Sequence, residues 1–138
     1  MEADIFANLF LFEGLSTAQR ALLRPLFEPC DCYAGTVLFE QGDPAEHLYA
    51  VVTGEVVVNF KPDDAPTLTV ARVQPGSIVG WSAVLGSRCY TSSAECTQYT
   101  QLLRVRGADL RRLCIQHPET GVQVLDRLAA VIAERLHS

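Results

Sequence analysis

The sequence predicts a mainly β protein with flanking helices, built as one domain of 138 residues. Between residues 30 and 106 the chain carries short runs rich in Val, Ile, Thr, Tyr and Phe, separated by Gly- and Pro-containing turns. Strands spaced about 8–12 residues apart in this way are typical of an all-β sandwich, barrel or jelly roll. On both sides of this stretch, apolar residues recur at helical spacing. The length suits a single sizeable core.

The first part of the chain, residues 1–29, is expected to be helical, with residues 4–28 as the helical stretch. Its apolar positions begin with Phe6, Leu9 and Phe10. Ser16 has the side chain and the position of an N-cap for the helix that follows. Pro25 interrupts the pattern and Pro29 ends it, because proline cannot continue a helix.

The middle part, residues 30–106, is predicted to form a β-barrel. A further short strand should end at Val79, just before Gly80. Val51 to Val57 is interpreted as two strands joined by a tight turn at Thr53-Gly54. The six main strands are expected at Thr36–Phe39, Leu48–Val52, Glu55–Phe60, Leu68–Val73, Ser92–Thr97 and Gln101–Val105.

The last part, residues 107–138, returns to helical spacing. Ala108–Gln116 is a short predicted helix, and Pro118 opens a longer one, a position where proline is favoured. Over residues 119–136 this helix is amphipathic, and its apolar stripe, which continues to Leu136, either packs on its own domain or pairs with a second copy of the chain. We favour a homodimer, because no later element could cover the stripe. The predicted dimer residues are Val124, Leu125, Leu128, Val131 and Ile132.

Composition excludes several classes of function. The net charge of −5 argues against nucleic acid as a direct partner. Apolar runs are too short to span a membrane and the N-terminus is acidic rather than basic, so we expect a cytoplasmic protein. The five Cys have irregular spacing, which favours reduced thiols over disulfides, a metal site or a haem. No set of residues suggests a catalytic site, so an enzyme ranks last among the hypotheses.

The most informative stretch runs from Ile78 to Ser92. Gly80 has no Cβ and would let the backbone approach a ligand closely. Ser82 is placed to cap a short turn over Ala83-Val84-Leu85, whose free N–H groups would then point at an anion. This arrangement is that of a phosphate-binding loop.

Motifs over most of the chain resemble the cyclic nucleotide-binding domain family, the sensor domain of catabolite-activator-type regulators, kinases and gated channels. The resemblance is carried by the glycine series at Gly35, Gly42, Gly54 and Gly76 and by runs that include Leu15-Ser-x3-Arg20-x-Leu22-Leu23, Gly35-Thr-Val-Leu-Phe-Glu-Gln-Gly42-Asp43, His47-Leu-Tyr-Ala-Val-Val-Thr-Gly54-Glu-Val-Val-Val58 and Gln74-Pro-Gly76-Ser-Ile-Val-Gly80. It implies a jelly-roll β-barrel in which a short helix between two strands, the phosphate-binding cassette, holds the cyclic phosphate. On this alignment the cassette covers Val79, Gly80, Trp81, Ser82, Ala83, Tyr90, Thr91 and Ser92.

Two cassette positions depart from the family pattern, which is similar to Phe-Gly-Glu-Leu-Ala-Leu-Leu-x-x-x-Pro-Arg-Ala-Ala. The Glu that would accept a hydrogen bond from the ribose falls on Trp81, a donor only, and the Arg that would bind the phosphate falls on Tyr90. Each loss costs about 1.5–3 kcal/mol, roughly tenfold to a hundredfold in affinity. Losing both should abolish micromolar binding of a cyclic nucleotide.

Three readings of function follow. The favoured one is a regulatory sensor module with weak or no binding of cAMP and cGMP, which signals to a protein partner and takes no ligand or another small anionic one. In the first alternative the chain binds cAMP, with Arg88 taking the phosphate. In the second it is a ligand-free dimeric scaffold whose pocket is filled by Trp81. No recognition helix or basic stripe follows residue 136, so a DNA-binding domain is not expected.

Overall fold

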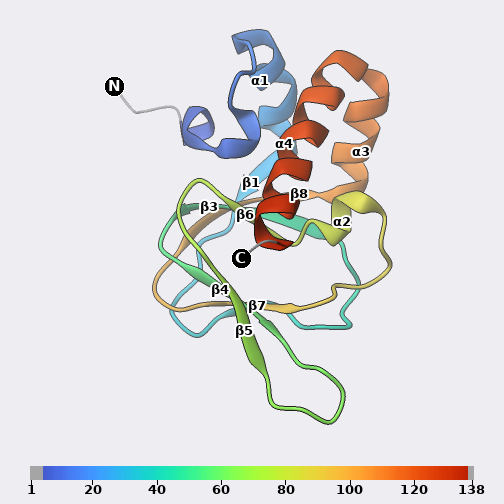
Figure 1. Cartoon of the computed structure of the whole chain (residues 1–138). Coiled ribbons are helices and arrows are strands. Elements are labelled where there is room, and N and C mark those ends of the chain that lie inside the picture. Colours follow the sequence, from blue (N-terminus) through green and yellow to red (C-terminus); the bar gives the residue numbers. More distant parts are fainter. Residues whose placement is uncertain (1–4, 137–138) are drawn as a thin grey trace.

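Two four-stranded antiparallel sheets face each other in a computed structural model that describes residues 5–136, apart from the side chains of Ile5, Ala7 and Leu136 (Figure 1). The first sheet has the order β1-β8-β3-β6, with β1 (Phe27–Pro29), β8 (Gln101–Arg106), β3 (His47–Thr53) and β6 (Ile78–Val79). The second has the order β2-β7-β4-β5, with β2 (Val37–Phe39), β7 (Ser93–Cys96), β4 (Val56–Phe60) and β5 (Leu68–Val73). This is the jelly-roll-like, mainly β architecture that the sequence predicts.

The helices gather on one side of the first sheet (Figure 1). Helices α3 (Gly107–Gln116) and α4 (Pro118–Leu136) lie side by side. The C-terminal end of α4 lies near β6 and α2 (Ser82–Leu85). The N-terminal segments η1 (Ile5–Asn8), η2 (Phe10–Phe12), α1 (Thr17–Leu23) and η3 (Arg24–Leu26) complete this layer. In the described part of the chain, no helix is both long and apolar enough to cross a membrane.

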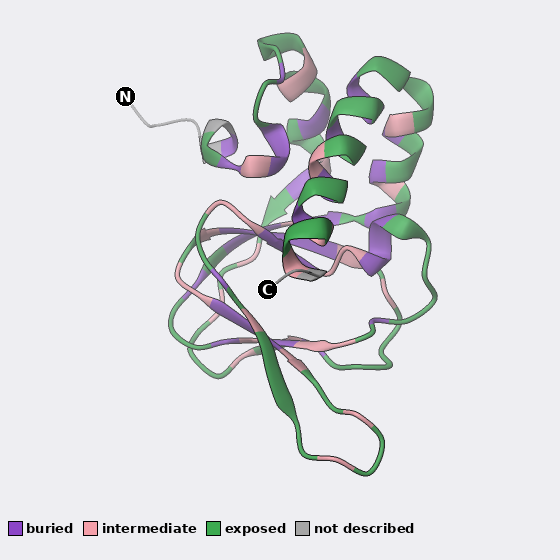
Figure 2. Cartoon of the chain, viewed as in Figure 1, coloured by how far each residue is buried: buried purple, intermediate pink, exposed green. Residues whose placement is uncertain are grey.

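Both faces of the first sheet are therefore covered, which explains the unbroken apolar run in β3. Leu48 and Ala50 belong to the core beneath the helices, whereas Tyr49 and Val51 belong to the core between the two sheets. Side chains of a strand alternate between its faces, so the part of a strand that is covered on both sides is apolar throughout, here from Leu48 to Val51. Figure 2 shows the resulting buried centre and the exposed, protruding β4–β5 hairpin.

The central strands confirm the prediction to within one residue at either end, but the N-terminal part does not. Residues 4–28 were expected to be helical; only Thr17–Leu23 is α-helix, short 3₁₀ turns surround it, and residue 4 lies outside the described range. The predicted N-cap at Ser16 is confirmed, and the side chain of Gln19 completes a capping box by accepting from the N–H of Ser16. Phe27–Pro29 instead pairs with β8, where Phe27 packs edge-on against Phe12 at 5.1 Å, so the strand β1 replaces the last predicted helical turn.

The predicted dimer stripe on α4 also needs correction. Val124, Leu128 and Val131 are buried in the core of their own domain, so they do not face outward. Of the other two, Ile132 is half-buried against the same core and only Leu125 is exposed, at 44%. The helix therefore packs on its own domain, the alternative that the sequence left open. Leu136 belongs to the same predicted stripe, but its side chain lies outside the described residues.

Candidate functional site

Within the cassette, Gly80 directly follows β6, which ends at Val79. Its φ of +84° lies in the left-handed region, and a Cβ there would stand 2.9 Å from the carbonyl oxygen of His47 and 3.3 Å from the ring of Tyr90. A side chain would therefore collide with the backbone of the neighbouring strand β3. The sequence attributed this glycine to close approach of a ligand, but in the structure it serves the packing of the cassette against the barrel.

The short helix α2 is not capped as predicted. Trp81 stands at the N-cap with a helical backbone conformation and no side-chain cap, and Ser82 is already the first helical residue. A cap residue needs an extended backbone, so the Ser82 hydroxyl cannot play this part. The N–H of Ala83 donates to the carbonyl of Gly80, and those of Val84 and Leu85 both donate to Trp81. The three N–H groups expected to point at an anion are thus used within the turn itself.

Tyr90, which the cassette motif predicts to replace the family arginine, is part of the barrel core. Its ring stacks on Phe39 with centroids 3.7 Å apart, and the residue is 5% exposed. The hydroxyl donates to the carbonyl oxygen of His47 at 2.6 Å and accepts from the N–H of His47 at 2.9 Å. Burial raises the pKa of this phenol, although the bonds to the backbone of His47 oppose the shift. The side chain offers neither a positive charge nor an unused donor to a ligand.

Trp81, at the position of the family glutamate, lies half-buried against the helical core and contacts the end of α4. The guanidinium carbon of Arg135 stands 4.9 Å from the centroid of the indole, a cation–π arrangement. Arg135 also donates to the Ser77 hydroxyl at 3.2 Å and to the carbonyl oxygen of Ile78. Burial lowers the pKa of Arg135 to about 10, so the side chain stays charged at neutral pH.

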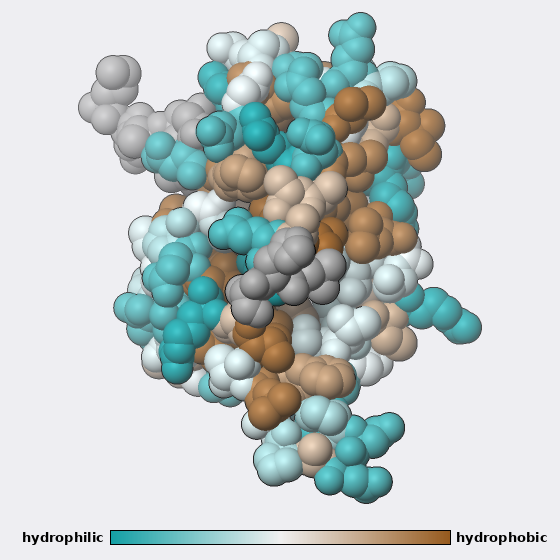
Figure 3. Space-filling model, in the orientation of Figure 1, coloured by the Kyte–Doolittle hydropathy of each residue, from teal (hydrophilic) through white to brown (hydrophobic). Residues whose placement is uncertain are grey.

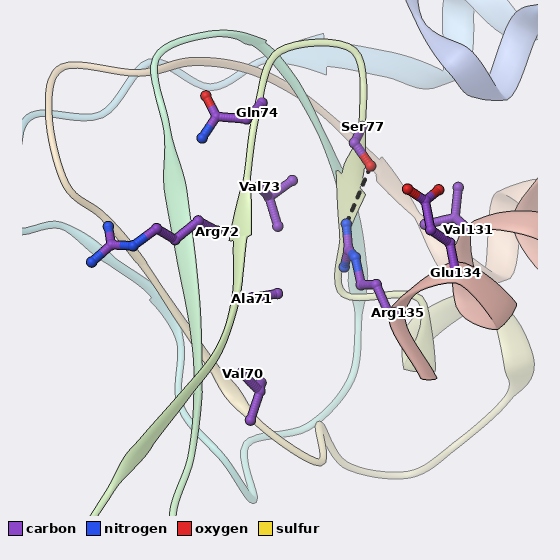
Figure 4. A pocket seen from close by; sticks show the side chains of 9 residues that line it. All are labelled: Val70, Ala71, Arg72, Val73, Gln74, Ser77, Val131, Glu134 and Arg135. Atoms are coloured by element: carbon purple, nitrogen blue, oxygen red, sulfur yellow. Dashed lines mark hydrogen bonds between the residues drawn. The ribbon is translucent and has the colours of Figure 1, made fainter. Parts of the chain in front are cut away.

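Two adjoining cavities share Arg135 as a wall. A small one of about 30 Å³ lies in the cassette itself, where Gly80, Trp81, Ser82, Tyr90, Thr91 and Ser92 line it together with Phe39 and Val58. A groove of about 340 Å³ runs between β5 and the end of α4 (Figure 4). Pockets for small molecules usually hold about 300–1,000 Å³, so the cassette cavity alone cannot enclose a nucleotide.

The remaining predicted residues are divided between core and surface. Val79 and Ala83 are buried and face the core, and the carbonyl of Ala83 accepts a hydrogen bond from Arg111 on α3. Thr91 and Ser92 line the cassette cavity, and their role toward a ligand stays a prediction. Arg88 is exposed on the following loop and lines neither the cassette cavity nor the groove.

Cys30 and Cys32, the close pair among the five cysteines, lie beside Leu102 and Thr100 of the barrel. The sulfur atoms of Cys30 and Cys32 are 4.0 Å apart, and burial raises the pKa of Cys32 to about 12, so this thiol is protonated at neutral pH. Within the described residues, no group of three or more His, Cys, Asp or Glu side chains is arranged to hold a metal ion.

Sequence reasoning missed Arg135 as a site residue. It lies 54 positions after Trp81 along the chain, and nothing in its local pattern distinguishes it from a solvated arginine near a helix end. Only the path of α4 across the sheet brings it to the cassette.

Comparisons with known proteins agree on one family. The family model for the cyclic nucleotide-binding domain matches residues 30–117. The chain is 25% identical over 126 residues to a CRP-like cAMP-activated global transcriptional regulator from Mycobacterium tuberculosis, covering 91% of this chain and 56% of that protein. It is 28% identical over 114 residues to the cAMP-dependent protein kinase regulatory subunit of Dictyostelium discoideum, covering 80% and 35%. The chain thus spans about half or less of these two relatives.

Solved structures show the same likeness. The catabolite activator protein of Thermus thermophilus superimposes with a TM-score of 0.79 at 29% identity, over 93% of this chain and 58% of that one.

Proposed function

This chain belongs to the cyclic nucleotide-binding domain family, and on that premise we propose that it is a regulatory ligand-binding module that binds cAMP and cGMP weakly or not at all. Its relatives include a transcriptional regulator and a kinase regulatory subunit, which favours a regulatory role over a catalytic one. The partner that receives the signal is another protein.

The position of Tyr90 carries this proposal. A cyclic phosphate needs a positively charged donor in the cassette, and the residue at that place is neutral, buried and bonded to the backbone of His47. Trp81 adds a second loss, because an indole cannot accept the hydrogen bond of a ribose hydroxyl. Losing two such contacts weakens binding by about 3–6 kcal/mol, a factor of more than a hundred.

Isothermal titration calorimetry with cAMP and cGMP at neutral pH tests the proposal. We expect no saturable binding below about 1 mM. A dissociation constant in the micromolar range for either nucleotide would contradict it. The Arg88→Gln variant then decides the alternative in which Arg88 takes the phosphate: that alternative requires a loss of about tenfold or more in affinity for cAMP.

We further propose that the module dimerises through the outward face of α4 rather than through its buried stripe. Val122 is 68% exposed, and together with Leu125, Ala129 and Ile132 it forms a line with the three- and four-residue spacing of a helix-pairing seam. An exposed apolar line of this kind favours a second helix as its cover.

Analytical ultracentrifugation tests the dimer. The wild-type chain should sediment as a dimer, and Leu125→Glu should shift it to a monomer. Gln123→Glu is the matched control, since it adds the same charge at an exposed polar position two residues earlier in α4. A wild-type monomer, or a Leu125→Glu dimer, would contradict the proposal. A dimer that binds no ligand in any titration would favour the scaffold alternative.

A further inference from the structure

We propose that Arg135, supplied by the last turn of α4, binds the negative charge of the ligand in place of the cassette side chain that Tyr90 has replaced. The inference rests on the proposed function, because it assumes that the cassette and the adjoining groove form the ligand site. It names the residue that reads the charge and the class of ligand that fits: a small organic anion with an apolar body.

The first argument is position. Arg135 is the only side chain that lines both the cassette cavity and the groove among the described residues. In Figure 4 its side chain extends from α4 toward Ser77, the residue that precedes β6. The indole of Trp81 lies beneath the guanidinium and the Ser77 hydroxyl accepts from it, so the charge is held at the junction of the two cavities.

The second argument is the distribution of charge around the groove. Arg72 contributes to its wall, but Figure 4 shows its side chain pointing away, and it forms an ion pair with Glu55 at 3.2 Å on the other face of β5. Arg135 is therefore the cation that faces the groove within the described part of the chain. Glu134 is the opposing charge at the same wall. A cation held largely out of water gains more from an incoming anion than an exposed one does.

The third argument concerns the rest of the ligand. Figure 4 shows Ala71 and Val73 of β5 pointing toward the groove, which Val70 and, on α4, Val131 also line. These walls suit an apolar body, while Arg135 and Ser77 suit a carboxylate or phosphate head group. The groove of about 340 Å³ is at the lower end of the usual range for small-molecule pockets, about 300–1,000 Å³.

The arrangement couples the ligand to α4. An anion bound by Arg135 would tie the last turn of the helix to the cassette, and the same helix carries the outward line of Val122 and Leu125. Occupancy of the site would then change the stability of the surface that α4 presents.

The experiment uses four probes: hexanoate, benzoate, phenyl phosphate and inorganic phosphate. Trp81 is the only tryptophan, so its emission reports directly on the site. We expect saturable changes with hexanoate, benzoate and phenyl phosphate, and weaker binding of inorganic phosphate, which has no apolar body. The carboxylates and the phosphate ester distinguish the two head groups. If none of the three organic probes binds by 10 mM, on the order of the weakest affinity of interest, the inference is overturned.

Variants assign the charge, with affinities measured by calorimetry because substitution of Arg135 alters the emission itself. Arg135→Gln should weaken the best probe at least about tenfold, Arg135→Lys should restore part of the loss, and Glu134→Gln should strengthen binding. Arg112→Gln, which removes an exposed arginine of α3 that lines neither cavity, should leave affinity unchanged. Urea denaturation of each variant checks its fold. Undiminished binding by a folded Arg135→Gln variant would overturn the inference.

Hydrogen exchange adds a readout that a merely structural arginine would not give. The best probe should increase protection of residues 130–136 in the wild-type chain but not in Arg135→Gln. The outcome is separable from the proposed function: micromolar binding of cAMP would contradict that function, whereas the role of Arg135 would still stand if Arg135→Gln weakened cAMP.

Discussion

Tyr90 and Trp81, the two cassette residues that depart from the family pattern predicted from the sequence, differ in burial and in the contacts they make. Tyr90 is a core residue, stacked on Phe39 and bonded through its hydroxyl to the backbone of β3. Trp81 is half-buried and is covered by Arg135 from a distant helix. The Tyr90 side chain is thus used by the fold itself, whereas the Trp81 side chain remains partly accessible and contacts a cation from another element. The comparison shows that two neighbouring cassette positions can differ in kind, one structural and one open to a ligand.

Removal of the Tyr90 ring should have the largest effect. Tyr90→Ala leaves a cavity between the sheets and should lower the free energy of unfolding by about 3–5 kcal/mol, as for other buried aromatic residues. Trp81→Ala, on the partly exposed wall, should cost distinctly less. Urea denaturation at pH 7.5 measures both. Equal losses would mean that the two walls are not different in kind.

Addition of a methyl group at Gly80 should cause the second largest loss of stability. Gly80→Ala combines a left-handed backbone with a collision against the His47 carbonyl, and we expect a loss of about 2–4 kcal/mol in unfolding free energy. Gly86→Ala is the matched control. Its φ of +82° is nearly the same, but nothing lies within 4 Å of the added Cβ, so only the strain of about 1–2 kcal/mol should remain. Similar losses in the two variants would show that close packing at Gly80 contributes nothing.

The hydroxyl of Tyr90 can be tested apart from its ring. Tyr90→Phe keeps the stack on Phe39 but leaves the N–H and carbonyl of His47 without this partner, which should cost about 1–3 kcal/mol. The measurement is again the urea midpoint. Tyr99→Phe provides a control, because that hydroxyl bonds to Asp31 on an exposed surface and should contribute much less. A Tyr90→Phe variant with the same urea midpoint as the wild-type chain would indicate that the ring alone, and not the hydroxyl, stabilises this part of the barrel.

The smallest effect concerns pH. Burial, followed by the charge of Arg104, lowers the pKa of His47 below its ordinary value of 6.5. The folded chain therefore favours the neutral imidazole: its contribution to stability is complete above pH 6.5 and is lost as the pH falls through the lowered pKa. The free energy of unfolding should decrease from pH 7.5 through 6.5 to 5.5, and this decrease should be smaller in the His47→Gln variant. His117→Gln, exposed between α3 and α4, should retain it. An unchanged slope in His47→Gln would contradict the assignment.

Much of the fold could be predicted because the strands carry their own signals. The runs rich in β-branched and aromatic residues and the turns with Gly or Pro locate β2 to β5, β7 and β8 almost residue by residue. Strand β1 was missed since Phe27-Glu28-Pro29 has only three residues, and its pairing with β8 comes from a segment more than 70 positions later. Short elements of this kind depend on distant partners rather than on local preference.

The candidate site was predicted only in part, for the same reason. The cassette residues from Gly80 to Ser92 are contiguous and could be found by their motif, and Thr91 and Ser92 do line the cavity. Whether the N–H groups of α2 were available, and which arginine lay nearby, depended on geometry that no local pattern records. The outward and buried faces of α4 were confused because both carry apolar residues.

The sequence by itself determined the family and the barrel and drew attention to Trp81 and Tyr90, because these follow from local patterns and from residue chemistry. The tertiary structure decided what those residues do. Tyr90 became core since β2 and β3 enclose it, and Trp81 became the floor of a charged junction since α4 crosses the first sheet and ends above it. Contacts between segments far apart in the chain are set by packing, and packing is the property that a linear pattern does not contain.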